Sequence, residues 1–129
     1  MSYTIDPESK VVRCLAWGTL SNEDLRDHYH QLAVDPQLTP AYRQLGDLSG
    51  VVALTADSAT IAEVASQPIF GVDVRRAIIA PSDSAFGVSR MFAIYAERAG
   101  QDVRVFRTAQ EAERWVTATG VEQAEPSKR

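Results

Sequence analysis

Apolar and polar positions near the start of the chain predict a β-hairpin. Residues 3–5 and residues 11–17 are two short runs rich in β-branched and aromatic side chains. The turn-forming residues 7–10 separate them, and Gly18 follows the second run. We therefore expect two paired strands, the second of which ends at Gly18.

An amphipathic helix is expected directly after this hairpin. Ser21 is a good N-cap residue, and Asp24 supplies a negative charge to the first turn. The helix should end before Pro36, because proline disfavours helical geometry in the residue that precedes it. Apolar side chains recur at helical spacing between these two ends, at Leu25, Tyr29, Leu32 and Ala33.

Three further runs predict buried strands. Residues 42–48 form the first, and residues 103–106 form the last. Between them, residues 77–80 are a continuous apolar run, which is typical of a central strand covered on both faces. Residues 51–54 are also apolar, and over four residues periodicity does not distinguish a continued strand from an apolar loop.

Each of these strands is followed by signals for a helix. Asp57 or Ser58 can cap the first helix, residues 81–84 begin the longest one, Gly100 ends it, and Thr108 caps the last. The apolar side chains on the inner faces of these helices are Ile61, Val64, Ala65, Val88, Met91, Phe92, Tyr95, Ala96, Ala99, Ala112, Trp115 and Val116.

Strands that alternate with helices after a hairpin predict a single α/β domain in the order β-β-α-β-α-β-α-β-α. Its sheet should be mixed, parallel in the later part and packed with helices. We expect the domain to span residues 1–120 and residues 121–129 to form a flexible polar tail. The side chains on predicted core faces that should be mostly buried are Trp17, Ile78, Ile79, Met91, Phe92, Val105 and Trp115.

Composition agrees with a compact protein and narrows the classes of function. The chain has 129 residues, of which 45% are hydrophobic and 23% are charged, which suits one globular domain. A formal net charge of −4 does not favour nucleic acid as a partner, although net charge does not report on a local basic patch. Because no apolar run could span a membrane and no secretion signal is evident, we expect a cytoplasmic location.

Few residues carry a recognisable chemical motif. His28 and His30 lie two apart on a helix, which points them to different sides, and we interpret both as surface residues. Cys14 is the only cysteine, so no intramolecular disulfide can form, and we expect a buried thiol. We interpret the adjacent Arg75 and Arg76 as the solvated start of a strand. No catalytic, phosphate-binding or metal-binding motif is present, so we expect no enzymatic activity, no metal and no cofactor.

Two turns are the most informative feature of the sequence. In a partly parallel sheet the carboxyl ends of the strands gather at one edge, where binding sites tend to form. Residues 47–58 and residues 81–84 follow such ends, are rich in hydroxyl and carboxyl groups, and lead into helix N-termini, which favour anions. Helix capping alone also explains these groups. The candidate contacts for a partner or ligand at this edge are Asp47, Ser49, Asp57, Ser58, Ser82, Asp83 and Ser84.

Short stretches of the sequence, together with the order of its elements, resemble the STAS-like superfamily over about residues 3–120. They resemble in particular the small stand-alone SpoIIAA-like proteins, which are related to anti-sigma factor antagonists. The resemblance implies the fold of that family. The stretches that carry it are residues 18–21 before the first helix, 47–51 at the end of a strand, 57–61 before the next helix, and 80–87, 90–92 and 105–107 for the stand-alone subgroup.

The resemblance also implies a candidate phosphoacceptor. In the antagonists the first serine of the motif D-S-S-G-L accepts a phosphate from a kinase, which switches off partner binding, and by position this serine is Ser58. Ala59 and Thr60 stand where the motif has its second serine and its glycine. A second register places residues 47–51 on the motif, which puts leucine at the acceptor position and makes Ser49 the residue of interest.

Two functions of different classes follow from these expectations. The first is a non-enzymatic regulatory domain that binds a protein partner at the carboxyl edge, and the resemblance implies a kinase-like anti-sigma factor as that partner. The alternative is a small apolar or lipid-like ligand, because some SpoIIAA-like proteins are similar to lipid-binding Sec14-type domains. Residues 51–54, Phe70 and Phe86 would line its pocket, and an enclosed volume of roughly 300 Å³ or more would favour it. Residues 51–54 are also the expected contact of a homodimer.

Overall fold

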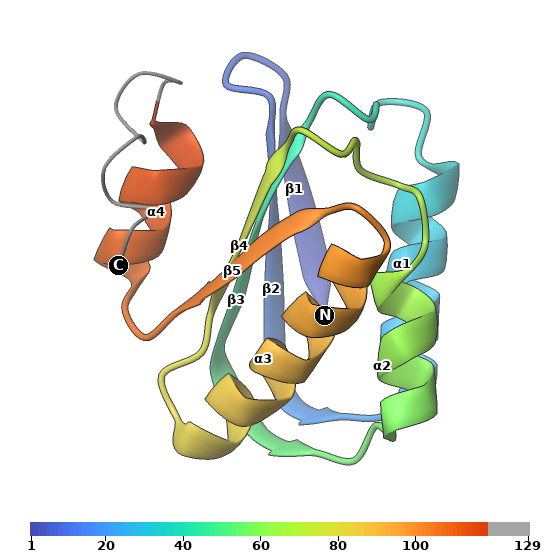
Figure 1. Ribbon diagram of the computed structural model, residues 1–129, viewed down its shortest axis with the longest axis vertical. Coiled ribbons are helices and arrows are strands. Elements are labelled where there is room, and N and C mark those ends of the chain that lie inside the picture. Colours follow the sequence, from blue (N-terminus) through green and yellow to red (C-terminus); the bar gives the residue numbers. More distant parts are fainter. Residues whose placement is uncertain (119–129) are drawn as a thin grey trace.

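Residues 1–118 are described by the computed structural model, and they form one mixed sheet with helices on both faces (Figure 1). Within this range the elements follow the predicted order, and the α/β fold class is confirmed. The predicted tail, residues 121–129, lies outside the described residues. The elements are β1 (Ser2–Asp6), β2 (Val11–Leu20), α1 (Asn22–Val34), β3 (Arg43–Leu54), α2 (Ser58–Ala65), β4 (Arg75–Ile79), α3 (Asp83–Arg98), β5 (Asp102–Phe106) and α4 (Ala109–Thr117).

Hydrogen bonds join the strands in the order β1-β2-β3-β4-β5. β1 pairs antiparallel with β2, whereas the pairs from β2 to β5 are parallel, so the sheet is mixed as predicted. The four parallel strands end at the same edge of the sheet, and each helix follows one of those ends (Figure 1). We call this edge the carboxyl edge.

Strands β2 and β3 extend beyond their predicted lengths. β2 continues through Gly18 to its end, and residues 51–54 continue β3 instead of forming a loop. The pairing of the two strands shifts register between Leu15 and Trp17 and again after Gly18, which has a φ of 72°. A glycine in the left-handed region lets a strand bend at such an irregularity without ending. The prediction that Gly18 closes the strand is therefore wrong.

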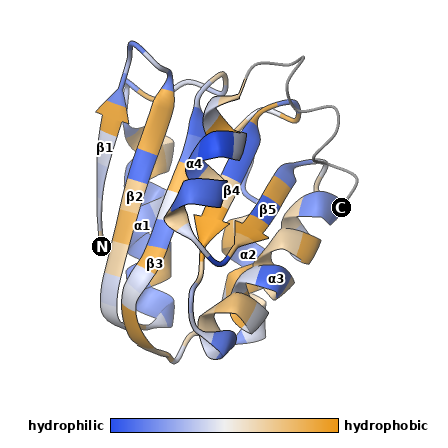
Figure 2. Ribbon diagram, turned by 90° about the vertical axis from the view of Figure 1, so that its left-hand side faces the viewer, coloured by the Kyte–Doolittle hydropathy of each residue, from blue (hydrophilic) through white to orange (hydrophobic). Residues whose placement is uncertain are grey.

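The sheet separates two hydrophobic clusters. Helices α1, α2 and α3 cover one face, and α4 covers part of the other (Figures 1 and 2). Val11 and Val12 are adjacent on β2 and belong to different clusters, because successive side chains of a strand point to opposite faces. The larger cluster contains Val12, Cys14, Tyr29, Leu32, Ile61, Val64, Ala65, Phe70, Phe92 and Ala96, and the smaller one Val11, Leu45, Ala77, Ile79, Ala112, Trp115 and Val116.

Most of the side chains predicted for the core lie there, but Trp17 does not. It is 51% exposed, because it points to the face of β2 on which α4 packs and lies beyond the area that α4 covers. Figure 2 shows α4 over the middle of the sheet, with β1 and most of β2 uncovered. Of the other predicted core residues, three are buried and three are partly buried: Ile79, Phe92 and Trp115, and Ile78, Met91 and Val105.

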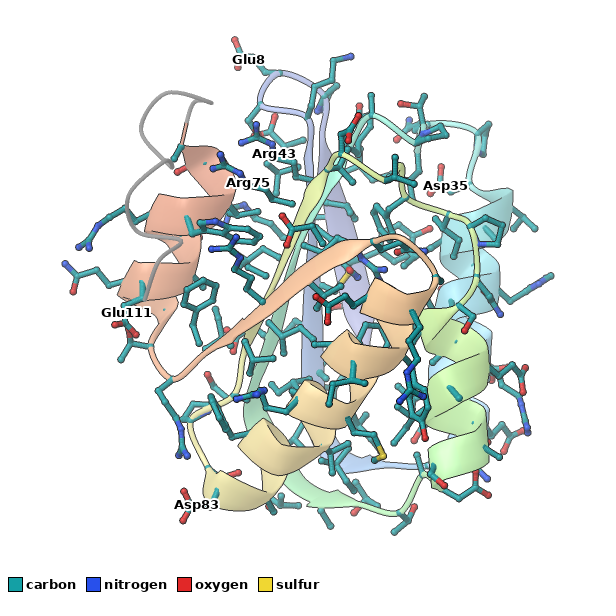
Figure 3. The ribbon with its side chains drawn as sticks, in the orientation of Figure 1. Glu8, Asp35, Arg43, Arg75, Asp83 and Glu111 are labelled. Atoms are coloured by element: carbon teal, nitrogen blue, oxygen red, sulfur yellow. The ribbon has the colours of Figure 1, made fainter. Side chains whose placement is uncertain are left out.

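Two arginines hold the end of α4 against the sheet. Arg75 Nη1 donates hydrogen bonds to the carbonyl oxygens of Trp115 at 2.7 Å and Ala118 at 3.2 Å. Arg43 Nη1 donates to Val116 O at 2.7 Å and to Ala118 O at 2.9 Å, and both arginines point toward α4 in Figure 3. They satisfy carbonyl groups that a helix end leaves without a partner. The prediction that Arg75 and Arg76 form the solvated start of β4 is wrong, since both are buried.

Candidate functional site

The predicted residues around α2 lie at the carboxyl edge, where Asp57 is the N-cap of the helix. Asp57 Oδ1 accepts a hydrogen bond from the Thr60 amide at 2.8 Å. Its other carboxylate oxygen and its amide both bond to Asn22, at the start of α1, at 3.1 and 2.8 Å. Ser58 is the first residue of α2 and is exposed. Asp57 therefore has a structural role, which leaves the hydroxyl of Ser58 accessible.

The predicted residues around α3 form a second group at the same edge. Ser82 caps the helix, and its hydroxyl oxygen accepts a hydrogen bond from the Ala85 amide at 3.1 Å. Asp83 is exposed and forms an ion pair with Arg107 at 2.8 Å, while Ser84 is exposed. Figure 1 shows the starts of α2 and α3 at opposite ends of this edge. The structure thus does not join the two groups into one site.

Asp47 and Ser49 lie on β3 between those groups. Asp47 Oδ1 accepts a hydrogen bond from the Ser49 amide at 2.9 Å, at the point where the register of β3 against β2 shifts. Asp47 is partly exposed and Ser49 is exposed. Asp47 also lines a cavity at this edge.

This cavity lies between the sheet and helices α1, α2 and α3, and we call it the edge cavity. Its volume is about 80 Å³. Small residues on two neighbouring strands, Ala16 and Gly46, form part of its floor. The partly exposed residues of its wall include Met1, Leu25 near the start of α1, Leu48 and Leu54 on β3, and Val88 near the start of α3, so its open side is at the carboxyl edge. Most of the apolar wall is formed by Leu20, Leu25, Leu48, Leu54, Ile61, Ile78, Val88 and Phe92.

The edge cavity only partly matches the predicted pocket. Of residues 51–54, Leu54 lines the cavity, whereas Phe70 and Phe86 do not. Its volume is below the 300–1,000 Å³ or so that is typical of drug-sized ligands. The cavity therefore has room for a small molecule and not for a long-chain lipid.

Three buried polar side chains line the cavity, although periodicity predicted an apolar interior. Ser89 on α3 is 3% exposed, and its hydroxyl oxygen has no hydrogen-bond partner among residues 1–118. Gln44 on β3 and His28 on α1 are also buried and line the cavity. Buried polar groups are normally hydrogen-bonded, so an unpaired hydroxyl beside an opening is a signal for a ligand or water.

His28 is buried, so the prediction that both histidines lie on the surface is wrong for this residue. His28 is 4% exposed, whereas His30 is exposed. His28 lies three residues after Leu25 and four before Leu32, so it shares the inner face of α1. Its ring packs against Tyr3 with a centroid separation of 5.9 Å. Burial, reinforced by the positive amino terminus, lowers the pKa of His28 to about 4.

Cys14 is buried in the cavity wall, as predicted. Burial raises the pKa of its thiol to about 11, so it is a neutral thiol at physiological pH and a weak nucleophile. Gln44 Nε2 donates to its sulfur at 3.5 Å. Within residues 1–118, no group of three or more histidine, cysteine, aspartate or glutamate residues could hold a metal ion, and no helix is long and apolar enough to cross a membrane.

The polar residues of the cavity were not predicted from the sequence, because they belong to no known motif and lie among apolar positions. Ser89 lies four residues after Ala85 and three before Phe92, in the middle of the inner stripe of α3. Gln44 and Leu45 are adjacent in a predicted strand, so they point to opposite faces of the sheet. The sequence does not show which of those faces is covered near Gln44. A polar residue inside an apolar stripe was the available signal.

Removal of the serine hydroxyl should separate capping serines from free ones. We expect Ser82→Ala to lower the free energy of unfolding by about 1 kcal/mol, because α3 loses its N-cap. Ser84→Ala and Ser58→Ala should each have a much smaller effect, since neither hydroxyl caps a helix. Urea denaturation of the three variants measures this, and equal effects would contradict the assignment of the caps.

The buried histidine should make stability depend on pH. Because the folded pKa of His28 is about 4 and the ordinary value is 6.5, the unfolded chain binds the extra proton first. Its contribution is present above pH 6.5 and is lost as the pH falls toward 4, by up to about 3 kcal/mol. The urea midpoint should decrease as the pH is lowered from 6.5 to 4, both for the native protein and for His30→Asn. For His28→Asn the decrease over the same range should be smaller.

Comparisons with known proteins add a fold neighbour and no relative by sequence. No family model and no curated protein matches the chain. A solved structure from Shewanella loihica PV-4, an uncharacterized protein of the DUF3478 family with a SpoIIAA-like fold, is similar with a TM-score of 0.59. The two are 17% identical, and the alignment covers 89% of this chain and 92% of that one. The chain thus has a SpoIIAA-like fold, as its resemblance to the STAS-like superfamily implied.

Proposed function

We propose that this protein is a non-enzymatic domain that binds a small, mostly apolar molecule in the edge cavity. The observation that carries the proposal is the unpaired, buried hydroxyl of Ser89 at the deep end of an apolar opening. Binding sites for small molecules typically combine an apolar wall with a few convergent polar groups. A ligand with one polar end would pair with Ser89 and bury its apolar part against the leucines near the opening.

The residues around the cavity support binding more than catalysis. The Cys14 thiol is neutral, and the His28 ring forms no hydrogen bond to it or to Ser89. A nucleophile paired with a base is the usual arrangement for covalent catalysis. A lipid-like ligand, expected as an alternative, is replaced in this proposal by a smaller one because of the cavity volume.

Filling the cavity should remove binding without unfolding the protein. A Cβ atom added to Gly46 would have only the Ala77 carbonyl oxygen within 4 Å, at 3.9 Å, so Gly46→Val can place its methyl groups in the cavity. We use 1-butanol as the probe and follow backbone amide resonances by NMR. The native protein and the surface control Gly87→Ala should show shifts around Ser89 that saturate with concentration, and Gly46→Val should not.

The same experiment decides against the proposal if it gives other results. Shifts that persist in Gly46→Val would place the probe outside the cavity. The absence of shifts in the native protein would show that the cavity does not accept a small molecule. Valine also has a higher strand propensity than glycine, so the urea midpoint of Gly46→Val should be equal to or above that of the native protein.

A regulatory protein partner at the start of α2 is the second candidate function. It is favoured by the position of Ser58, which is exposed, is not used as a cap and lies in the first turn of a helix. A phosphate there would add about −1.5 to −2 charges at a helix end that tolerates negative charge. The switch would then act on a partner and not on the fold.

The homodimer expected through residues 51–54 stays a prediction, and Val52 in that stretch is 81% exposed.

This second function makes a prediction about modification. We expect mass spectrometry of the protein purified from its own cells to find phosphate on Ser58, and Ser58→Ala to remove it. Ser84 is the matched control, because it is also an exposed serine in the first turn of a helix. Phosphate on both serines would indicate unspecific modification, and phosphate on neither would refute the switch.

A further inference from the structure

A buried arginine that forms no ion pair within residues 1–118 lies behind the edge cavity. Arg76 on β4 is 1% exposed and packs between the rings of Phe70 and Phe92, with its guanidinium carbon 4.5 and 5.4 Å from their centroids. Its Nε donates to Gln44 Oε1 at 2.9 Å, and its Nη1 donates to Gln101 Oε1. Its Nη2 has no hydrogen-bond partner among residues 1–118.

The side chains that contact Arg76 within the described part of the chain are neutral. Two of its partners are glutamine side chains. Burial raises the pKa of the Tyr29 hydroxyl, and it raises that of the Cys14 thiol to about 11, so neither is an anion at neutral pH. None of the four ion pairs among the described residues includes Arg76. A buried cation that lacks a paired anion is costly, which makes an external anion the natural complement.

The neighbours of Arg76 form the deep wall of the cavity. Gln44, Tyr29, Cys14 and Phe92 all line it. Gln44 connects Arg76 to the cavity. Its side-chain oxygen accepts a hydrogen bond from the guanidinium, and its side-chain nitrogen donates to Cys14 in the cavity wall. A positive charge on the oxygen side of an amide polarises its N–H groups and makes them better donors. The field of Arg76 thus reaches the cavity through a wall of neutral side chains.

The cavity is polarised along its length. At the deep end, the unpaired Ser89 hydroxyl and the Gln44 amide offer hydrogen-bond donors. Near the opening, the wall is formed by leucine and valine side chains such as Leu25 and Val88. The carboxylate that lines the cavity is Asp47, which is partly exposed and already accepts a hydrogen bond from the Ser49 amide. Met1, which carries the positive amino terminus, also lines the cavity, so the negative charge of Asp47 is not the only charge at the wall. An anionic group would therefore be held by the donors near Arg76 and would be repelled by Asp47.

We propose that the ligand of the edge cavity is a small aliphatic monocarboxylate, whose carboxylate lies at the Gln44–Ser89 wall in front of Arg76 and whose hydrocarbon part lies toward the opening. This inference rests on the proposed function, since it requires that the cavity binds a small molecule. Beyond the proposed function, the inference specifies that this molecule is an anion. The donors and the buried cation select the carboxylate, and the cavity volume restricts the chain to a few carbon atoms.

The test compares two probes of similar shape, sodium butyrate and neutral butyramide, by NMR titration at constant ionic strength. We expect butyrate to bind the native protein about tenfold more tightly than butyramide, because hydrogen bonds to an ionised acceptor are about twice as strong as neutral ones. Arg76→Gln should abolish this preference. Ser89→Ala should weaken both probes, because the serine hydroxyl would donate to either oxygen.

A second charge variant keeps the test decisive if Arg76→Gln does not fold. Asp47→Asn preserves the shape of a partly exposed side chain and removes its negative charge from the cavity wall. Asp47→Asn should strengthen the binding of butyrate several-fold and leave the affinity for butyramide unchanged. The control is Asp83→Asn, which lies at the same edge but outside the cavity and should change the affinity for neither probe. The absence of an effect of Asp47→Asn on butyrate would overturn the inference.

The possible outcomes separate this inference from the proposed function. If 1-butanol and butyramide bind as well as butyrate, the cavity binds small molecules without selecting a carboxylate, and the inference fails while the proposed function stands. If none of the three probes binds, both fail. A preference for butyrate that survives Arg76→Gln assigns the selection to another group and also overturns the inference.

Discussion

The alternation of side chains along β4 is the constraint on which both layers of the structure depend. Arg75 and Arg76 are adjacent, so they point to opposite faces of the sheet. Arg75 reaches the carbonyl groups at the end of α4, and Arg76 lies in the core under α1 and α3. One pair of residues thus fixes the single helix on one face and places a positive charge on the other.

The cavity lies beside this charge and shares Gln44 with it. Gln44 uses its amide to meet Arg76, and the small residues Ala16 and Gly46 leave space beside it. A larger apolar residue at position 46 would fill that space, and the strand would gain from it. A cavity that is retained at the expense of packing is the usual compromise at a binding site. The fold itself does not specify such a site, because one fold supports many functions.

The likeness to the Shewanella protein shows how far architecture persists when sequence does not. At 17% identity the two chains share the order of the strands and helices over most of their length. Patterns of buried and exposed positions are enough to preserve that order. The chemistry of the interior, such as the unpaired hydroxyl of Ser89 or the buried Arg76, depends on single residues and must be argued for each chain.

The sequence by itself determined the order of the elements, the caps at Ser21 and Thr108, and the mixed sheet, because these follow from local periodicity and from the chemistry of helix ends. For α2 it left Asp57 and Ser58 as alternatives, and the structure shows that Asp57 is the cap. The sequence also located the carboxyl edge, since the ends of parallel strands always gather there. It placed only part of the site, however, namely Asp47 and Leu54 of the cavity wall.

Tertiary structure alone decided the remainder. Trp17 is exposed because α4 is too short to cover β2, and no local pattern reports the area that a distant helix shields. His28 and Arg76 are polar residues that a sequence scale places outside, yet they are buried because elements far along the chain close over them. The unpaired hydroxyl of Ser89 and the cavity beside it exist only once α3 is packed on the sheet, since a void is a property of several elements together.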